Sequence, residues 1–156
     1  MKSPQPNSLK CFVCGLENPY GLHLRFFESE PGEVIAEVTV PEQYQGYPGI
    51  VHGGIIAAML DEVAGRSQMG TPDAPRFMFT GRLDIHYRKN VPVCSPLRLE
   101  GRAGERKGRI AKAESAIYDP TGILLAVAEV MLVDIPESDI HKDDLEALGW
   151  KVYPQA

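Results

Sequence analysis

The strongest constraint on the fold is one proline-free segment, IIAAMLDEVAGRSQM, which follows a loop dense in glycine and proline. Strong helix formers dominate this segment, so the sequence predicts a helix of about four turns over residues 55–69. Apolar side chains cover much of its circumference and small ones fill part of the rest: Ile55, Ile56, Met59, Leu60 and Val63, with Ala57, Ala58 and Ala64. A helix that is apolar on so many sides is expected to be buried rather than to lie on a surface.

Alternating patterns predict strands on both sides of this helix. Before it, residues 22–27 and 34–40 alternate around Pro31-Gly32, which is typical of a β-hairpin. After it, Leu83, Ile85 and Tyr87 alternate with polar residues in a half-buried strand. Three more strands are joined by the turn-like segments ERKG and DPTG, at residues 97–105, 109–118 and 123–134. One long helix with about five or six mostly antiparallel strands predicts the α+β class, with a sheet curled around the helix.

Composition limits the organisation and the classes of function. The 156 residues fit one domain, which we expect to comprise an irregular N-terminal arm at residues 1–21, a core at 22–135 and a polar tail with a short helix at 136–156. A net charge of −5 argues against a nucleic-acid partner. No stretch approaches the ~20 apolar residues that span a bilayer, and no secretory signal is present. Because the three cysteines cannot form a closed disulfide framework, we expect a cytoplasmic protein without a membrane partner.

The start of the predicted helix has the features of a binding site. The tripeptide before Gly53 contains no Ser, Thr, Asp or Asn, so the first backbone N–H groups of the helix have no obvious side-chain acceptor. With the positive end of the helix dipole, such donors polarise a carbonyl group as negative charge develops on its oxygen. Gly53 and Gly54 also let a ligand approach the backbone closely. We therefore expect a ligand at this helix end.

A base or nucleophile is the second requirement, and Asp61 and Glu62 are the acidic residues within the apolar helix. At about 100° per residue, Asp61 shares a stripe of small residues with Ala57, Ala58 and Gly65, which leaves room around its carboxylate. Glu62 is more simply explained as an ion-pair partner of Arg66 one turn later, at the helix surface or at an interface. We therefore prefer Asp61 as the functional acid.

His52 and Asp61 lie nine residues apart, which in one helix separates them by about 13 Å along the axis and places them on roughly opposite sides. They cannot meet within one chain. If both serve one site, the acid comes from a second subunit, and a symmetric homodimer with two composite sites is the economical hypothesis. The alternative is that His52 only caps or packs the helix and that Asp61 is an ordinary solvated residue.

The segment HGGIIAAMLDEVAG resembles the signature of hot-dog thioesterases of the phenylacetate-degradation type, in the 4-hydroxybenzoyl-CoA thioesterase-like superfamily. The resemblance continues through TGRLDIHYRKNVPV and ERKGRIAKAESAIYDPTGILLAVAEVMLV, and it covers roughly residues 20–135. It implies a hot-dog fold, in which a curved antiparallel sheet wraps around one long central helix. It also implies an enzyme that hydrolyses an acyl-coenzyme A thioester to the free acid and CoA.

The resemblance assigns roles to single residues. It implies that Asp61 acts as general base or nucleophile and that the Gly53 N–H polarises the thioester carbonyl. It implies that His52 orients the site from the opposing subunit. Thr80 resembles a hydroxyl position that holds the catalytic water, with an ordinary strand threonine as the equal alternative.

The resemblance also implies an assembly, and the sequence departs from the family at one position. Members of the family form homodimers in which two helices lie side by side beneath a continuous sheet, and a dimer of dimers is a further option. The family often has Asn or Gln six residues before the histidine. Here Gly46 occupies that position and Gln45 precedes it, so Gln45 is a candidate site residue with its register shifted by one.

Coenzyme A needs cations for its phosphate groups. The sequence offers basic residues in the turn between two late strands and on the strand that precedes them: Arg106, Lys107, Gly108 and Arg109, with Arg88 and Lys89. The alternative is that these charges only keep exposed hairpins soluble. Acyl-CoA is the ligand that the resemblance implies, and we expect neither a separate cofactor nor a metal.

Cys11 and Cys14 form a CxxC pair inside CFVCGLENPYGL, but no second CxxC follows. A zinc site would need further ligands. A redox role is weaker still, because the pair does not begin a helix after a strand. We therefore expect the pair to pack the arm over the core or over a partner subunit.

Two other classes of function compete with the thioesterase. A non-catalytic hot-dog module that binds acyl-CoA as a sensor or scaffold is disfavoured by Asp61 at the signature spacing. A dehydratase or hydratase of the same fold expects a different spacing of histidine and acid on the helix. The sequence identifies neither the acyl group nor whether acyl carrier protein replaces CoA.

Overall fold

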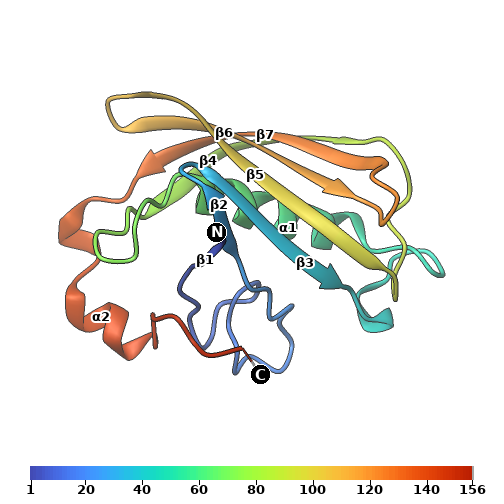
Figure 1. Cartoon of the computed structure of the whole chain (residues 1–156), viewed down its shortest axis with the longest axis horizontal. Coiled ribbons are helices and arrows are strands. Elements are labelled where there is room, and N and C mark those ends of the chain that lie inside the picture. Colours follow the sequence, from blue (N-terminus) through green and yellow to red (C-terminus); the bar gives the residue numbers. More distant parts are fainter. Residues whose placement is uncertain (156) are drawn as a thin grey trace.

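The computed structural model describes residues 1–155 and all of their side chains except that of Lys142. Its two α-helices and seven strands follow one another as β1 (Ser3–Pro4), β2 (Phe27–Glu30), β3 (Glu33–Thr39), α1 (Gly53–Ser67), β4 (Met78–Tyr87), β5 (Pro96–Lys107), β6 (Ile110–Tyr118), β7 (Leu124–Asp134) and α2 (Lys142–Ala147). Figure 1 shows the sheet curving over α1, which confirms the predicted α+β class. Within the described residues, no helix has the length and apolar character needed to cross a bilayer.

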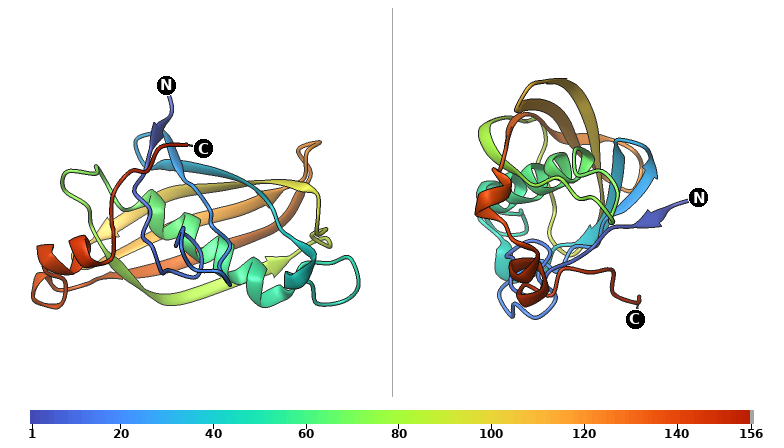
Figure 2. Two further views of the ribbon diagram at one scale, coloured as in Figure 1. Left: turned by 90° about the horizontal axis from the view of Figure 1, so that it is seen from below. Right: turned by 90° about the vertical axis from the view of Figure 1, so that its left-hand side faces the viewer.

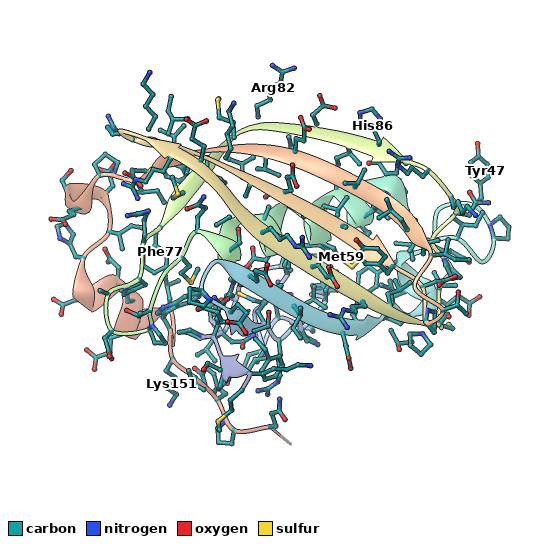
Figure 3. All side chains as sticks on the ribbon, turned by 45° about the horizontal axis from the view of Figure 1, so that its top comes forward. Tyr47, Met59, Phe77, Arg82, His86 and Lys151 are labelled. Atoms are coloured by element: carbon teal, nitrogen blue, oxygen red, sulfur yellow. The ribbon has the colours of Figure 1, made fainter. Side chains whose placement is uncertain are left out.

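The strands form one antiparallel sheet in the order β1-β2-β3-β5-β6-β7-β4. The hairpins at β5–β6 and β6–β7 follow the sequence prediction closely, and the short β1 is the strand that the sequence did not indicate. Strand β4 forms one edge of the sheet and pairs only with β7 within the described chain. Figure 3 shows Arg82 and His86 of β4 pointing away from the body of the molecule. The sheet therefore ends in a long, open edge beside α1.

One side of α1 packs against the sheet. Ile56, Met59, Leu60 and Val63 are buried there, and Figure 3 shows Met59 between the ribbons. Helix and strand β5 approach so closely that a Cβ on Gly101 would collide with the Val63 carbonyl oxygen. This face supplies the apolar burial that stabilises the fold.

The other side of α1 is only partly covered. Gly54 is exposed, and Ala57, Ala58, Asp61 and Gly65 are partly exposed. Nothing stands within 4 Å of a Cβ added at Gly65. The expectation that α1 is buried is therefore confirmed for the face that packs on the sheet, whereas the stripe of small residues that carries Asp61 is only partly covered in the single chain.

The first predicted strand is also wrong over most of its length. Leu22, Leu24 and Phe26 are buried as their alternation suggests, but β2 begins only at Phe27. His23 has a φ of 55°, a left-handed conformation that interrupts an extended strand. The backbone N–H groups of Leu22 and Leu24 donate to the arm. The alternation thus reports burial beneath the N-terminal arm, not membership of the sheet.

The N-terminal arm and the C-terminal tail lie on the side of α1 away from the sheet, as Figure 2 shows. Arg66 of α1 joins them, with 1% of its surface exposed. Its guanidinium lies 4.6 Å from the ring centre of Phe26 and 4.9 Å from that of Trp150, and it donates to the Pro6 carbonyl. Its Nε is 3.1 Å from Glu62 Oε1. The predicted ion pair between Glu62 and Arg66 is therefore present, but its guanidinium is the buried centre of the contact between α1, the arm and the tail rather than a surface group.

We expect Arg66→Ala to lower the free energy of unfolding by about 3–5 kcal/mol, because it leaves Glu62 without its partner in a buried setting. Urea denaturation of the full chain measures the loss. Arg102→Ala is the matched control, since Arg102 is 65% exposed and its Nε lies 3.9 Å from Glu33; such a pair contributes about 1 kcal/mol or less. Equal small losses in both variants would contradict the central role of Arg66.

Candidate active site

The first turn of α1 is capped by the histidine itself. His52 occupies the N-cap position with φ −57° and ψ 137°, and its Nδ1 accepts a hydrogen bond from the Gly54 N–H at 2.9 Å. The prediction that the helix start lacks a side-chain acceptor is therefore wrong for Gly54. Capping is the alternative role that the sequence allowed for His52, and an imidazole nitrogen is a competent acceptor although histidine is not among the usual capping residues.

The Gly53 N–H, in contrast, has no hydrogen-bond acceptor within residues 1–155. The carbonyl of Gly53 accepts a hydrogen bond from the Tyr87 hydroxyl at 2.9 Å, which ties the helix start to the end of β4. A cleft of about 470 Å³ opens here, and its lining includes Tyr47, His52, Gly53, Tyr87 and Lys89. One free donor at a helix N-terminus thus borders a cleft large enough for a small acyl group.

The loop before α1 uses Gln45 within itself. Gln45 Oε1 accepts a hydrogen bond from the Gly49 N–H at 3.0 Å, and the side chain does not line the cleft at the helix start. Gly46 packs against His52, which would lie 3.3 Å from a Cβ at that position. A contact between Gln45 and a substrate therefore stays a prediction.

Asp61 and Thr80 meet within one chain. The Thr80 hydroxyl donates to Asp61 Oδ1 at 2.6 Å, from the start of the edge strand β4. The pairing of β4 with β7 shifts register between Thr80 and Arg82, and such an irregularity re-aims a side chain. No sequence pattern indicated the bond itself, because it joins residues 19 positions apart.

Asp61 and Thr80 line a second groove, of about 650 Å³, together with Glu62 and both cysteines of the arm. This groove shares no lining residue with the cleft at the helix start. The single chain therefore carries the free backbone donor in one hollow and the Asp61 carboxylate in another.

The two helix acids are both partly exposed, and they differ in their partners. The pKa of Glu62 is raised to about 7, chiefly because burial disfavours its charged form, and the nearby Arg66 only partly offsets this. Glu62 is engaged by Arg66 on the side of α1 that faces the arm and the tail, whereas Asp61 stands on the stripe of small residues and accepts from Thr80. Asp61 is therefore the acid on the open side of α1.

The basic candidates fall into two groups at opposite ends of the sheet. Arg88 and Lys89 follow the end of β4, where both of their N–H groups donate to the Leu125 carbonyl. The other group, at residues 106–109, lies at the β5–β6 turn near the start of β4, since Ile110 pairs with Val133 and Val133 with Phe79. One chain therefore does not bring the two groups together.

The basic side chains at residues 106–109 are not equally free to bind a ligand. Arg106 pairs with Asp134 at 2.8 Å, and its Nε donates to the Gly108 carbonyl. Arg109 donates to the Asp134 carbonyl at 3.3 Å. Lys107 is exposed at the end of β5. A phosphate group would meet Lys107 and Arg109 more readily than Arg106.

Residues 48–126 match the family model of the thioesterase superfamily. A curated relative, acyl-coenzyme A thioesterase THEM4 of Bos taurus, is 32% identical over 99 residues, which are 63% of this chain and 39% of the relative. The chain spans less than half the length of the curated relatives that it matches.

Solved structures agree with this match. The thioesterase superfamily protein RHA08564 superposes with a TM-score of 0.72 at 30% identity, over 80% of this chain and 60% of that one. The protein smu.793 of Streptococcus mutans, solved with acetyl CoA, superposes with a TM-score of 0.64 at 20% identity, over 72% of this chain and 88% of that one. These likenesses confirm the predicted hot-dog fold.

We expect His52→Ala to lower the free energy of unfolding by about 1 kcal/mol, because Gly54 then loses its acceptor at the helix start. His52→Asn, which keeps an acceptor at the N-cap, should retain most of that stability. Thermal and urea denaturation of both variants beside the wild type measure the difference. Equal losses in the two variants would show that the cap contributes nothing.

Proposed function

The chain belongs to the thioesterase superfamily, and we propose that it hydrolyses an acyl-CoA thioester to the free acid and CoA at a site shared by two subunits. The observation that carries the proposal is that one chain holds the backbone donor and the acid in two separate hollows. A free Gly53 N–H borders one hollow, and the Asp61 carboxylate, held by Thr80, lines another. The acyl-coenzyme A thioesterases among its relatives and the neighbour solved with acetyl CoA support the substrate class.

In the proposed dimer, a two-fold axis beside Ala57 brings the cleft of one subunit next to the groove of the other. In two antiparallel helices related by such an axis, residues equally far from it lie level with each other. Gly53 and Asp61 are each four positions from Ala57, so the Gly53 N–H of one subunit comes level with the Asp61 of its partner. Small residues on the outward stripe of α1 permit this close approach.

The open edge of β4 supports the same arrangement. Antiparallel pairing of β4 with its copy extends the sheet across two chains and removes an unpaired edge. It also brings Arg88 and Lys89 of one subunit toward the β5–β6 turn of the other. The two basic groups then surround one composite site, where they would bind the phosphates of CoA. The assembly is a homodimer, and a dimer of dimers is compatible with it.

The chemistry follows from these positions. The Gly53 N–H donates to the thioester carbonyl oxygen and stabilises the negative charge that develops on it. Asp61 takes a proton from water, whose oxygen attacks the carbonyl carbon, or attacks that carbon directly to form an anhydride that water then hydrolyses. The carbon–sulfur bond breaks, and CoA leaves as a thiolate that takes up a proton. Thr80 positions Asp61, and His52 positions the Gly53 turn.

Three free cysteines lie within the described chain, and they support our proposal of a reducing, cytoplasmic location. The competing function is a module that binds acyl-CoA without turning it over. The organisation of the chain into arm, core and tail at residues 1–21, 22–135 and 136–156 is likewise proposed.

We expect Asp61→Asn to lower kcat by about 10²–10⁴-fold, because it removes the base or nucleophile and keeps the side-chain size. A panel of acyl-CoA esters, followed by release of free thiol, measures the effect beside the wild type. Asp84→Asn is the control, since Asp84 is an exposed acid on the outward face of β4. If the wild type binds acyl-CoA but turns over none of the panel, the sensor or scaffold is correct instead.

Gly53→Pro is expected to lower kcat by about 10²–10³-fold, because it deletes the proposed backbone donor. Proline suits the first helical position, and the extended backbone of His52 suits the residue before a proline. Gly53→Ala keeps the N–H and is the matched control. Mixing refolded Gly53→Pro and Asp61→Asn chains should restore about a quarter of wild-type activity, because half of the dimers then carry one intact site. No recovery in mixed dimers, or a fully active monomer, would overturn the shared site.

A further inference from the structure

Three side chains outside this proposed chemistry gather beneath the N-terminal arm. The sulfur atoms of Cys11 and Cys14 and a carboxylate oxygen of Glu62 all lie within 4.8 Å of one another. The cysteines come from the arm and the glutamate from α1. Among the described residues, these three form the one group of three or more cysteine, histidine or acidic side chains that lie close enough together to share an ion.

The backbone of the arm is shaped to hold both sulfur atoms toward α1. The Gly15 N–H donates to the Cys11 carbonyl at 2.8 Å, and a Cβ at Gly15 would collide with the Cys11 backbone. Only glycine therefore closes this turn. Cys14 is buried beneath this turn and Cys11 is partly exposed, with both sulfur atoms within 4.8 Å of a Glu62 carboxylate oxygen.

Glu62 distinguishes a metal site from the alternatives. A dithiol that forms a disulfide needs only the two sulfur atoms, and packing of the arm needs no acid. Glu62 brings a carboxylate oxygen within 4.8 Å of both sulfur atoms, while its Oε1 accepts a hydrogen bond from the buried Arg66. Two thiolates and one carboxylate carry three negative charges, which a divalent cation and Arg66 together balance.

We propose that Cys11, Cys14 and Glu62 bind Zn²⁺, with a water molecule in the fourth position, and so fasten the arm to α1. Tetrahedral Zn²⁺ with sulfur at about 2.3 Å and oxygen at about 2.0–2.2 Å places its ligand atoms roughly 3.5–3.8 Å apart, a spacing that fits within this cluster. Both cysteines and Glu62 line the groove of about 650 Å³, which gives the ion a path from solvent. Asp61 lines the same groove, but the zinc site does not depend on the proposed hydrolysis.

Zinc content and affinity of the full chain test the proposal. Mass spectrometry of the protein, purified with a phosphine reductant, should find one zinc per chain. Chelator-treated protein should bind Co²⁺ with a sulfur-to-cobalt charge-transfer band, and added Zn²⁺ should remove this band and raise Tm. Cys11→Ser should lower Zn²⁺ affinity by more than about 100-fold, since loss of an outer-shell partner alone costs 10–100-fold.

Two further variants keep the test decisive. Glu62→Gln still offers Arg66 an acceptor, so it should fold, keep the charge-transfer band and bind Zn²⁺ at least about 10-fold more weakly. Cys94→Ser is the control, because Cys94 is exposed and lies between β4 and β5; it should bind like the wild type. Absence of stoichiometric zinc, a cobalt spectrum without the sulfur band, or equal affinity in Cys11→Ser and Cys94→Ser would overturn the site.

Discussion

The packing of one apolar helix face against the curved sheet determines the rest of the structure. Val63 and Gly101 bring α1 and β5 into direct backbone contact, so the helix cannot shift without separating the core. Because that face of α1 packs on the sheet, Gly53 lies beside the end of β4 and Asp61 lies on the opposite, partly exposed side of the helix. The position of each candidate site residue is thus a consequence of how the core is buried.

A second contact fixes the opposite side of the helix. Arg66 lies between two aromatic rings and binds the arm through the Pro6 carbonyl, which draws residues far apart in sequence onto one turn of α1. A buried guanidinium is costly to desolvate, so it stabilises only where its partners are all in place. The arm, the tail and Glu62 therefore depend on one another. Together they leave the small-residue stripe as the open side of α1.

The sequence predicted the regular parts of the fold better than the contacts of the site. Strands β5, β6 and β7 were located closely because alternation and short turns are local signals. The segment from Leu22 to Phe26 failed because burial beneath an arm produces the same alternation as a strand. The capping by His52 and the Thr80–Asp61 bond depend on side-chain orientation and on contact between distant residues. Periodicity contains no information about either.

Helical geometry explains why a composite site suits this chain. A backbone donor is available only at the N-terminus of a helix, whereas an acid there would compete with a ligand for that same donor. Placing Asp61 two turns later keeps the Gly53 N–H free, but it also puts donor and acid beyond each other's reach. The proposed two-fold axis would resolve this conflict, because each helix of the dimer would supply its first turn to one site and its acid to the other. The outward stripe must consist of small residues for this to work, and Ala57, Ala58 and Gly65 meet that requirement.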